Sequence, residues 1–336
     1  MTNLDAVSVA PIGFASSGTS PGTAATLHLV GLGQVGRAIL RRLDAHNLRL
    51  VAASDSSGTI AERTGLDASA LERSKAEGRP LAASGLAGDL PLELLVELVH
   101  ADVLADASAS RFDGGAAALE RTERALRCGS RVVFASKDAL AAGSHAWREE
   151  IRSGRIGWNA ALGGTGRRLA AELAELAPEL EEIELVANAT TSCVFEELER
   201  GGGWESALRR ARERGLCEGS AEADLDGRDA AAKLAIVAGA LFGRPIAADE
   251  IERTDVRTLE PEALRGRTIR LVARATRSGQ FRVRPEELPR GSILAAPCDR
   301  VVYSYRARDG RRRVHIGNGL GPARTAQALL ADGGAP

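Results

Sequence analysis

The chain has 336 residues, enough for two domains, and its 44 basic and 45 acidic residues nearly cancel to a net charge of −1. That balance argues against nucleic acid or an anionic membrane surface as a partner, and no apolar run approaches the ~18 residues of a membrane helix. The 4 cysteines are scattered without a C-x-x-C pair, which argues against a disulfide framework or a zinc site and favours a reducing cytoplasm.

The chain opens with residues 1–25, which are rich in Ser, Gly, Ala, Thr and Pro. This composition predicts a disordered N-terminal segment. The segment carries Asp5 and lacks a basic region, so it does not have the pattern of a signal peptide.

A glycine-rich motif follows a short predicted strand over residues 26–31. The motif Gly31-Leu32-Gly33-Gln34-Val35-Gly36 precedes apolar residues at helical spacing, which is the context that a dinucleotide-binding fingerprint requires. Its glycines permit a tight turn, approach of a pyrophosphate and close packing of helix on strand. The predicted cofactor residues in this motif are Gly31, Gly33, Gln34, Val35 and Gly36.

A second predicted strand, residues 48–53, leads to Asp55. Asp55 stands 24 residues after Gly31, about where an acidic residue binds the adenosine ribose of a dinucleotide. Ser56 and Ser57 follow and can serve a 2′-phosphate, so both NAD and NADP remain open. We include Asp55 and Ser56 among the predicted cofactor residues.

Two more strands, 103–107 and 131–135, flank a predicted helix over residues 114–128. This βαβ alternation predicts an α/β fold with a Rossmann-type, doubly wound parallel sheet. Ligands gather at the carboxyl ends of such strands, which places Ser108, Ser136 and Lys137 at the mouth of a site. On position alone, the Ser136-Lys137 pair reads equally well as a solvated loop. We assign residues 26–155 to a dinucleotide-binding domain.

The pattern changes after Ile156, and residues 156–316 are assigned to a second, substrate-binding domain. Small residues fill a loop at 159–166, which either gathers carbonyls around a cation or simply turns the chain. After a predicted strand at 183–187, residues 188–192 cluster hydroxyls and an amide, suited to a polar ligand or to capping a helix.

The most informative stretch joins Asp229 and Lys233, four residues apart in a segment of helical composition. They share a helix face, as an ordinary exposed ion pair also would. Two observations argue against a surface pair: the helix is almost wholly apolar, and only 3 of the 44 basic residues are lysines. In a pocket, a carboxylate would orient Lys233 while desolvation tuned its proton affinity. The other two lysines are Lys75 and Lys137. For Lys75, chance explains the presence of a lysine as well as a function does.

The C-terminal part contains two predicted strands, 301–306 and 313–316, and then a second glycine loop, 317–322. A helix over residues 323–331 follows. Residues 317–336 therefore read as a loop and helix that return to the nucleotide domain, and Gly317 and Gly321 are candidate cofactor residues. A structural turn would look similar.

Taken together, these motifs resemble those of the homoserine dehydrogenase family across residues 27–332. The similar segments are Gly31–Gly36, Asp55–Gly58, Ser136–Leu140, Asn188–Ser192, Gly215–Lys233 and Gly317–Gly321 with Thr325-Ala326. In the longest of them, Glu218, Asp224, Asp229 and Lys233 are in register with the family's signature.

The resemblance implies reversible oxidation of L-homoserine to L-aspartate 4-semialdehyde with NAD(P), a step of threonine and methionine biosynthesis. It implies Lys233 as general acid/base, Asp229 as its orienting partner and Lys137 beside the reacting centre. Glu218, Asp224 and Thr190 would bind the amino-acid end. The implied fold adds to the Rossmann domain an α+β domain that serves the substrate and a homodimer interface. No ACT-type regulatory domain follows residue 336, so feedback inhibition through one is not expected.

The sequence also departs from the family. Asn159 replaces a usual Glu and Gly166-Arg167 replaces Ile/Leu-Pro, in a loop whose backbone carbonyls hold a sodium ion in the family. The carbonyls implied here are those of Asn159, Leu162, Gly164 and Gly166. Backbone ligands survive side-chain changes, but the altered loop leaves sodium open.

Further departures are Ser136, Ser192, Leu320 and Ser220-Ala221. They keep two alternatives in view: a related dehydrogenase for another amino-acid-derived alcohol, and a non-catalytic dinucleotide-binding protein.

Overall fold

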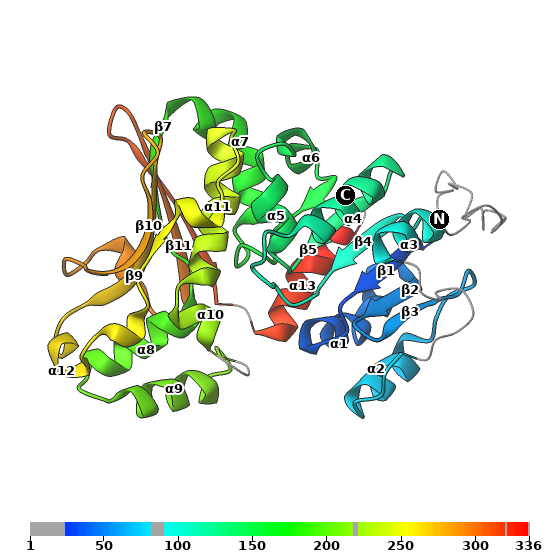
Figure 1. The fold of residues 1–336 in the computed structure, drawn as a ribbon, viewed down its shortest axis with the longest axis horizontal. Coiled ribbons are helices and arrows are strands. Elements are labelled where there is room, and N and C mark those ends of the chain that lie inside the picture. Colours follow the sequence, from blue (N-terminus) through cyan, green and yellow to red (C-terminus); the bar gives the residue numbers. More distant parts are fainter. Residues whose placement is uncertain (1–23, 82–90, 218–220, 320, 335–336) are drawn as a thin grey trace, which may run out of the picture.

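A computed structural model describes residues 24–81, 91–217, 221–319 and 321–334. The predicted disordered segment 1–25 falls almost wholly outside these residues. Two sheets organise the described chain, one from its first half and one from its second (Figure 1). None of the helices in the described ranges is long and apolar enough to span a membrane.

The first sheet has the strand order β3-β2-β1-β4-β5-β6. Its strands are β1 (Ala25–Val30), β2 (Leu48–Asp55), β3 (Gly58–Ala61), β4 (Val103–Asp106), β5 (Arg131–Phe134) and β6 (Ile156–Gly157). All pairs are parallel except β2–β3. The doubly wound sheet is confirmed, but a wholly parallel sheet was wrong for β3. Only Ser56 and Ser57 join β2 to β3, and so short a connection can link only antiparallel strands.

Helices of the first half and the last helix of the chain cover this sheet (Figure 1). They are α1 (Gln34–Leu40), α2 (Ala68–Ala76), α3 (Leu92–Val99), α4 (Ala116–Arg127), α5 (Asp138–Gly143), α6 (Arg148–Arg152) and α13 (Pro322–Gly333). The helix predicted over residues 114–128 is α4, and Gly129 after it has a positive φ of 88°. Such a conformation suits glycine at a helix C-terminus.

The second sheet has the order β12-β11-β7-β9-β10-β8. Its strands are β7 (Leu180–Val186), β8 (Glu252–Arg253), β9 (Ile269–Thr276), β10 (Phe281–Glu287), β11 (Arg300–Ala307) and β12 (Arg312–Asn318). The accompanying helices are α7 (Gly166–Glu179), α8 (Ala189–Glu199), α9 (Trp204–Glu213), α10 (Glu222–Leu225), α11 (Arg228–Phe242) and α12 (Pro261–Leu264). Four short 3-10 turns complete the described chain: η1 (Leu43–His46), η2 (Ala248–Glu250), η3 (Val256–Thr258) and η4 (Ile293–Ala295).

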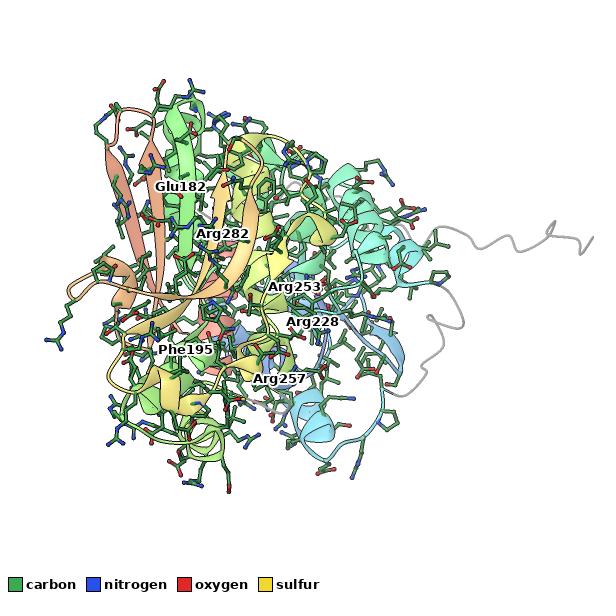
Figure 2. All side chains as sticks on the ribbon, turned by 60° about the vertical axis from the view of Figure 1, so that its left-hand side comes forward. Glu182, Phe195, Arg228, Arg253, Arg257 and Arg282 are labelled. Carbon is green, nitrogen blue, oxygen red and sulfur yellow. The ribbon has the colours of Figure 1, made fainter. Side chains whose placement is uncertain are left out.

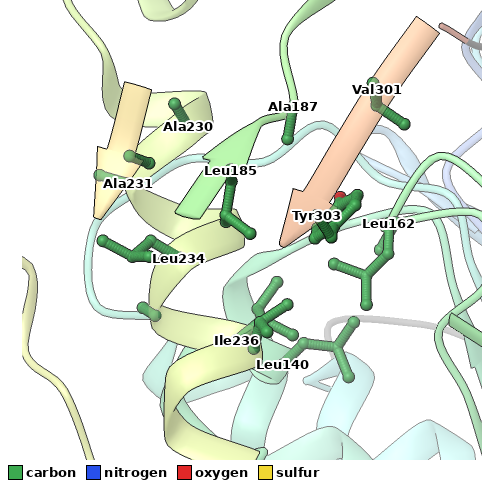
Figure 3. Packing of buried hydrophobic residues seen from close by; sticks show 14 of the residues in the cluster. Leu140, Leu162, Leu185, Ala187, Ala230, Ala231, Leu234, Ile236, Val301 and Tyr303 are labelled. Atoms are coloured by element: carbon green, nitrogen blue, oxygen red, sulfur yellow. The ribbon is translucent and has the colours of Figure 1, made fainter. Parts of the chain in front are cut away.

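Helix α11 is the apolar helix expected around Asp229 and Lys233. Its Leu234 and Ile236 are buried in the main core with Leu185 of β7 and Tyr303 of β11 (Figure 3). The helix also contacts α5 of the first half. Because α11 packs on both halves, it carries its polar residues to the place where the two halves meet.

The other side of the second sheet is polar in large part. Glu182 on β7 and Arg282 on β10 lie on this side (Figure 2). At the centre of this face, Arg274 of β9 forms an ion pair with Glu184. Its guanidinium nitrogens also lie 2.9 Å from carboxylate oxygens of Glu182 and Glu286. The alternation of side chains along each strand separates this charged face from the apolar face under α11.

We predict opposite outcomes for two glycines of the first loop. A Cβ at Gly36 would lie 2.0 Å from the Gly31 carbonyl oxygen, whereas a Cβ at Gly33 would meet nothing within 4 Å. Gly36→Ala should therefore lower the free energy of unfolding by about 1–3 kcal/mol. Gly33→Ala should leave it unchanged. Urea unfolding of both variants checks this, and equal stabilities would contradict the close packing of α1 on β1.

Candidate active site

A cavity of about 970 Å³ is lined by residues from both halves of the described chain. Of the predicted site residues, it is lined by Gly31, Gly33, Gln34, Val35, Asp55, Ser56, Ser108, Lys137, Thr190, Asp224, Asp229 and Lys233. The cavity lies where the strand order reverses between β1 and β4, the place where doubly wound sheets bind ligands. The structure thus brings the predicted nucleotide and substrate residues to one site.

The glycine loop is built tightly. Gly31 has a positive φ of 89°, and a Cβ there would lie 2.4 Å from the Ser108 backbone nitrogen. Gly36 packs under the loop against Gly31, so it supports the cavity rather than lining it. Gly33 has open space beside it, which leaves room for a ligand to approach its backbone.

Asp55 lies at the carboxyl end of β2 and lines the cavity. Its Oδ1 accepts bonds from the Ser57 backbone nitrogen at 2.8 Å and the Ser57 hydroxyl at 2.5 Å. Its Oδ2 lies 2.7 Å from Lys75 Nζ. Burial alone would raise the pKa of Asp55, but the bonds from Lys75 and Ser57 outweigh it and lower the pKa. Asp55 is therefore an ionised acceptor at neutral pH.

Ser108 and Ser136 follow strands β4 and β5. Ser108 donates its backbone N–H and hydroxyl to Asp106, which is buried and lies 2.6 Å from Arg121. Ser136 is buried rather than lining the cavity, and its hydroxyl has no partner among the described residues. The adjacent Lys137 does line the cavity.

Two lysines from different halves of the chain share one carboxylate. Lys233 Nζ lies 2.7 Å from Asp229 Oδ2, and Lys137 Nζ lies 3.2 Å from Asp229 Oδ1. Lys233 also donates to the Ala187 carbonyl oxygen at 2.6 Å. All three charged side chains are less than a fifth exposed, so this is not an ordinary surface ion pair.

A second carboxylate lies beside the first. The Asn188 amide donates to Asp224 Oδ1 at 2.7 Å and to Asp229 Oδ2 at 2.9 Å. Burial, and then the charge of Asp229, raise the pKa of Asp224. Burial would also raise the pKa of Asp229, but Lys233 and Lys137 reverse this and hold it well below its usual range. The two aspartates therefore differ in proton affinity although they are neighbours.

The remaining predicted residues have mixed positions. Thr190 lines the cavity, and its hydroxyl donates to the Leu216 carbonyl oxygen at 2.7 Å. Glu218 lies outside the described residues. Gly317 packs against the Gly163 carbonyl, where a Cβ would lie 2.2 Å away, and Gly321 precedes α13. Neither is among the lining residues, whereas Asn318 and Gly319 between them are.

Hydrogen bonds within the chain already use several carbonyls of the loop at 159–166. Of the four carbonyls that the resemblance implies, Asn159 O accepts from Gly164 N, Leu162 O from the Thr165 hydroxyl and Gly166 O from the Trp158 indole. The described residues also contain no cluster of acidic, His or Cys side chains suited to a metal. The chain's own donors thus occupy this loop, and no step of a mechanism is assigned to a cation there.

An ion pair ties the same loop to the end of the chain. Arg167 Nε lies 2.7 Å from Asp332 Oδ1, and Asp332 Oδ2 accepts the Asn159 backbone N–H at 2.8 Å. Of the two departures from the family, Arg167 attaches the loop to α13 through its side chain, whereas Asn159 does so through its backbone N–H.

Comparisons with known proteins agree with this site. A family model described as homoserine dehydrogenase matches residues 169–333, and one described as glutamate/leucine/phenylalanine/valine dehydrogenase matches residues 14–105. A homoserine dehydrogenase of Methanocaldococcus jannaschii is 27% identical, over 90% of this chain and 96% of the relative. An NAD(+)-dependent homoserine dehydrogenase of Pseudomonas canavaninivorans is 26% identical, over 91% of this chain and 94% of the relative.

Solved structures give the same result. A hyperthermophilic archaeal homoserine dehydrogenase in complex with NADPH superposes with a TM-score of 0.73 at 25% identity, covering 92% of this chain and 96% of that one. Along nearly all of its described length the chain is similar to homoserine dehydrogenases. The predicted resemblance is confirmed, and with it the Rossmann-type fold.

Sequence reasoning missed the contacts of two residues that bond predicted site residues, Asn188 with the two aspartates and Lys75 with Asp55. Asn188 was read only as part of a polar cluster, although its place directly after strand β7 was a signal that it reaches the site. Lys75 carried no motif, and its rarity as a lysine was the only hint that it pairs with Asp55.

We predict a pH-dependent effect for Asp229→Asn. The folded-state pKa of Asp229 lies below its unfolded value of about 4, so ionisation stabilises the fold above that pH and the benefit is lost as pH falls. The variant should lose about 3 kcal/mol of unfolding free energy at pH 7 because two buried lysines lose their counter-ion. The loss should shrink below pH 4, as measured by urea unfolding.

Asp226→Asn is the matched control, because Asp226 pairs with Arg228 at 2.7 Å in a more exposed position. Its effect should stay within about 1 kcal/mol. A loss for Asp229→Asn that is independent of pH would contradict the assignment of the buried charge.

Proposed function

We propose that this chain catalyses the reversible oxidation of L-homoserine to L-aspartate 4-semialdehyde with NAD(P), in the biosynthesis of threonine and methionine. The observation that carries the proposal is the Lys233–Asp229–Lys137 cluster on the same cavity as the glycine loop. The cavity volume of about 970 Å³ has room for a dinucleotide and a small amino acid together.

The residues present fit a dinucleotide. Gly33 leaves its backbone open to a pyrophosphate, Asp55 offers an ionised carboxylate to a ribose, and Ser56 and Ser108 line the cavity nearby. When bound, the nicotinamide accepts or returns the hydride of the reaction. Lys75 beside Asp55 places a positive charge next to that carboxylate, so both NAD and NADP are candidates.

Lys233 is suited to exchange the proton of the substrate oxygen. An ammonium has three N–H donors, and two of them bond Asp229 and the Ala187 carbonyl. The third remains for an alcohol or aldehyde oxygen in the cavity. In oxidation the neutral amine of Lys233 would take the hydroxyl proton and become the ammonium as hydride leaves the carbon, and in reduction the ammonium would return that proton to the aldehyde oxygen.

The substrate's amino-acid end would lie on the opposite side of the cluster. Asp224 faces the cavity with a carboxylate suited to the substrate's ammonium group, and Glu218 and Thr190 are its proposed companions. Lys137 bonds the free oxygen of Asp229 and so keeps a positive charge beside the reacting centre. Asp229 thereby orients both lysines.

A second copy of the chain is the proposed partner of the charged face of the second sheet. The Glu182, Glu184 and Arg274 ladder offers both signs of charge, and Ile316 of β12 is 51% exposed beside it. A homodimer through this face would leave the cavity open on the other side of the sheet. The described residues contain no disulfide, which fits the cytoplasm as the proposed location.

We predict homoserine-dependent reduction of NAD+ or NADP+ by the purified protein. The assay follows absorbance of the reduced cofactor with each nucleotide in turn, using homoserine, threonine, serine and 3-hydroxy acids as substrates. Turnover of another alcohol alone would contradict homoserine as the substrate. Cofactor binding without any turnover would favour a non-catalytic dinucleotide-binding protein.

Replacing Lys233 should separate chemistry from binding. Lys233→Ala removes the exchangeable proton, and Lys233→Arg keeps a charge that is not readily released, so both should lower kcat by at least ~10²-fold. Affinity for the cofactor, measured by calorimetry, should stay unchanged because Lys233 bonds Asp229 and the Ala187 carbonyl rather than the glycine loop. Wild-type turnover in either variant would refute Lys233 as the acid/base.

A further inference from the structure

Asn188 stands at the junction between strand β7 and helix α8, and its side chain is only 5% exposed. Its backbone neighbour Ala187 accepts the hydrogen bond from Lys233. The adjacent residues Ala187 and Asn188 therefore contact Lys233, Asp229 and Asp224 between them.

The orientation of the Asn188 amide is fixed by its own helix. Oδ1 accepts the Thr191 backbone N–H at 2.9 Å and thereby caps the first turn of α8. Because Oδ1 faces a backbone donor, Nδ2 must face the other way. There its two N–H groups reach Asp224 at 2.7 Å and Asp229 at 2.9 Å.

This arrangement answers an electrostatic problem. Asp224 and Asp229 are neighbouring carboxylates, and each disfavours ionisation of the other in a site of low polarity. The lysines bond Asp229, whereas the amide of Asn188 donates to both carboxylates. A hydrogen bond to a carboxylate favours its ionised form. The Asn188 bonds accordingly lower the pKa of Asp224, against the burial that raises it.

We propose that Asn188 is a positioning residue that holds two carboxylates side by side for different tasks, Asp229 for the lysines and Asp224 for the substrate's ammonium group. The assignment of the tasks rests on the proposed function. Asn188 itself touches neither substrate nor cofactor in this role and acts through the two aspartates.

The test is Asn188→Ser. Serine keeps an oxygen that can cap α8 but has no amide to share between the aspartates. The pKa of Asp224 should rise further, so the acid limb of the kcat/KM profile for homoserine should move to higher pH by about 1 unit. A lost hydrogen bond to a charged group corresponds to about a tenfold loss of kcat/KM at a pH on that acid limb. KM should carry more of the loss than kcat, and activity should recover at high pH.

Asp67→Ser is the matched control, because Asp67 caps α2 by accepting the Ala70 backbone N–H at 2.9 Å and does not line the cavity. It should leave the pH profile unchanged. A role limited to capping would lower the stability of Asn188→Ser without moving the acid limb, and that result would overturn the proposal.

A second readout does not depend on turnover. Carbon-13 titration of aspartate carboxyls, with the Asp224 signal assigned through Asp224→Asn, should show a higher pKa for Asp224 in Asn188→Ser than in the wild type. An unchanged Asp224 titration would also overturn the proposal, whereas lack of activity on homoserine would contradict only the proposed function. If Asn188→Ser does not fold, Asn188→Asp keeps the shape and the cap, and its added charge should raise the pKa of Asp224 still more.

Discussion

The site depends on one buried carboxylate that serves two ammonium groups. Asp229 faces Lys233 from its own helix and Lys137 from the end of a strand in the other half of the chain. Such a group costs free energy to bury unless its partners compensate, and here both lysines do. The interaction therefore does more than orient a side chain, because it fixes how the substrate half meets the nucleotide half at the cavity.

The surroundings of α11 make this interaction possible. The helix is apolar over most of its surface and packs against β7 and α5, so its Asp229 and Lys233 have little access to water. Low polarity strengthens the attraction between Asp229 and its lysines and also the repulsion from Asp224. The amide of Asn188 lies between the two aspartates, where that repulsion is greatest.

The features that the sequence alone predicted are those set by the spacing of residues close together in the chain. Asp229 and Lys233 are one helical turn apart, and Gly31 to Gly36 form one turn between strand and helix, so both features are readable without tertiary structure. The bridge from Asn188 to Asp224 spans 36 residues and required the fold. No strand was predicted between residues 243 and 300, where β9 and β10 carry arginines on their charged face and lack a simple apolar pattern. The β2–β3 hairpin was missed because four residues give little periodicity.

The position of α13 has a consequence for how the protein is made. Its Leu329 and Leu330 are buried in the core of the first sheet with Leu27 and Leu29 of β1, almost the whole chain away. The first sheet therefore keeps an apolar face uncovered during synthesis until the last helix leaves the ribosome. Folding of the two halves is thus not sequential, since the half that is translated first is completed last.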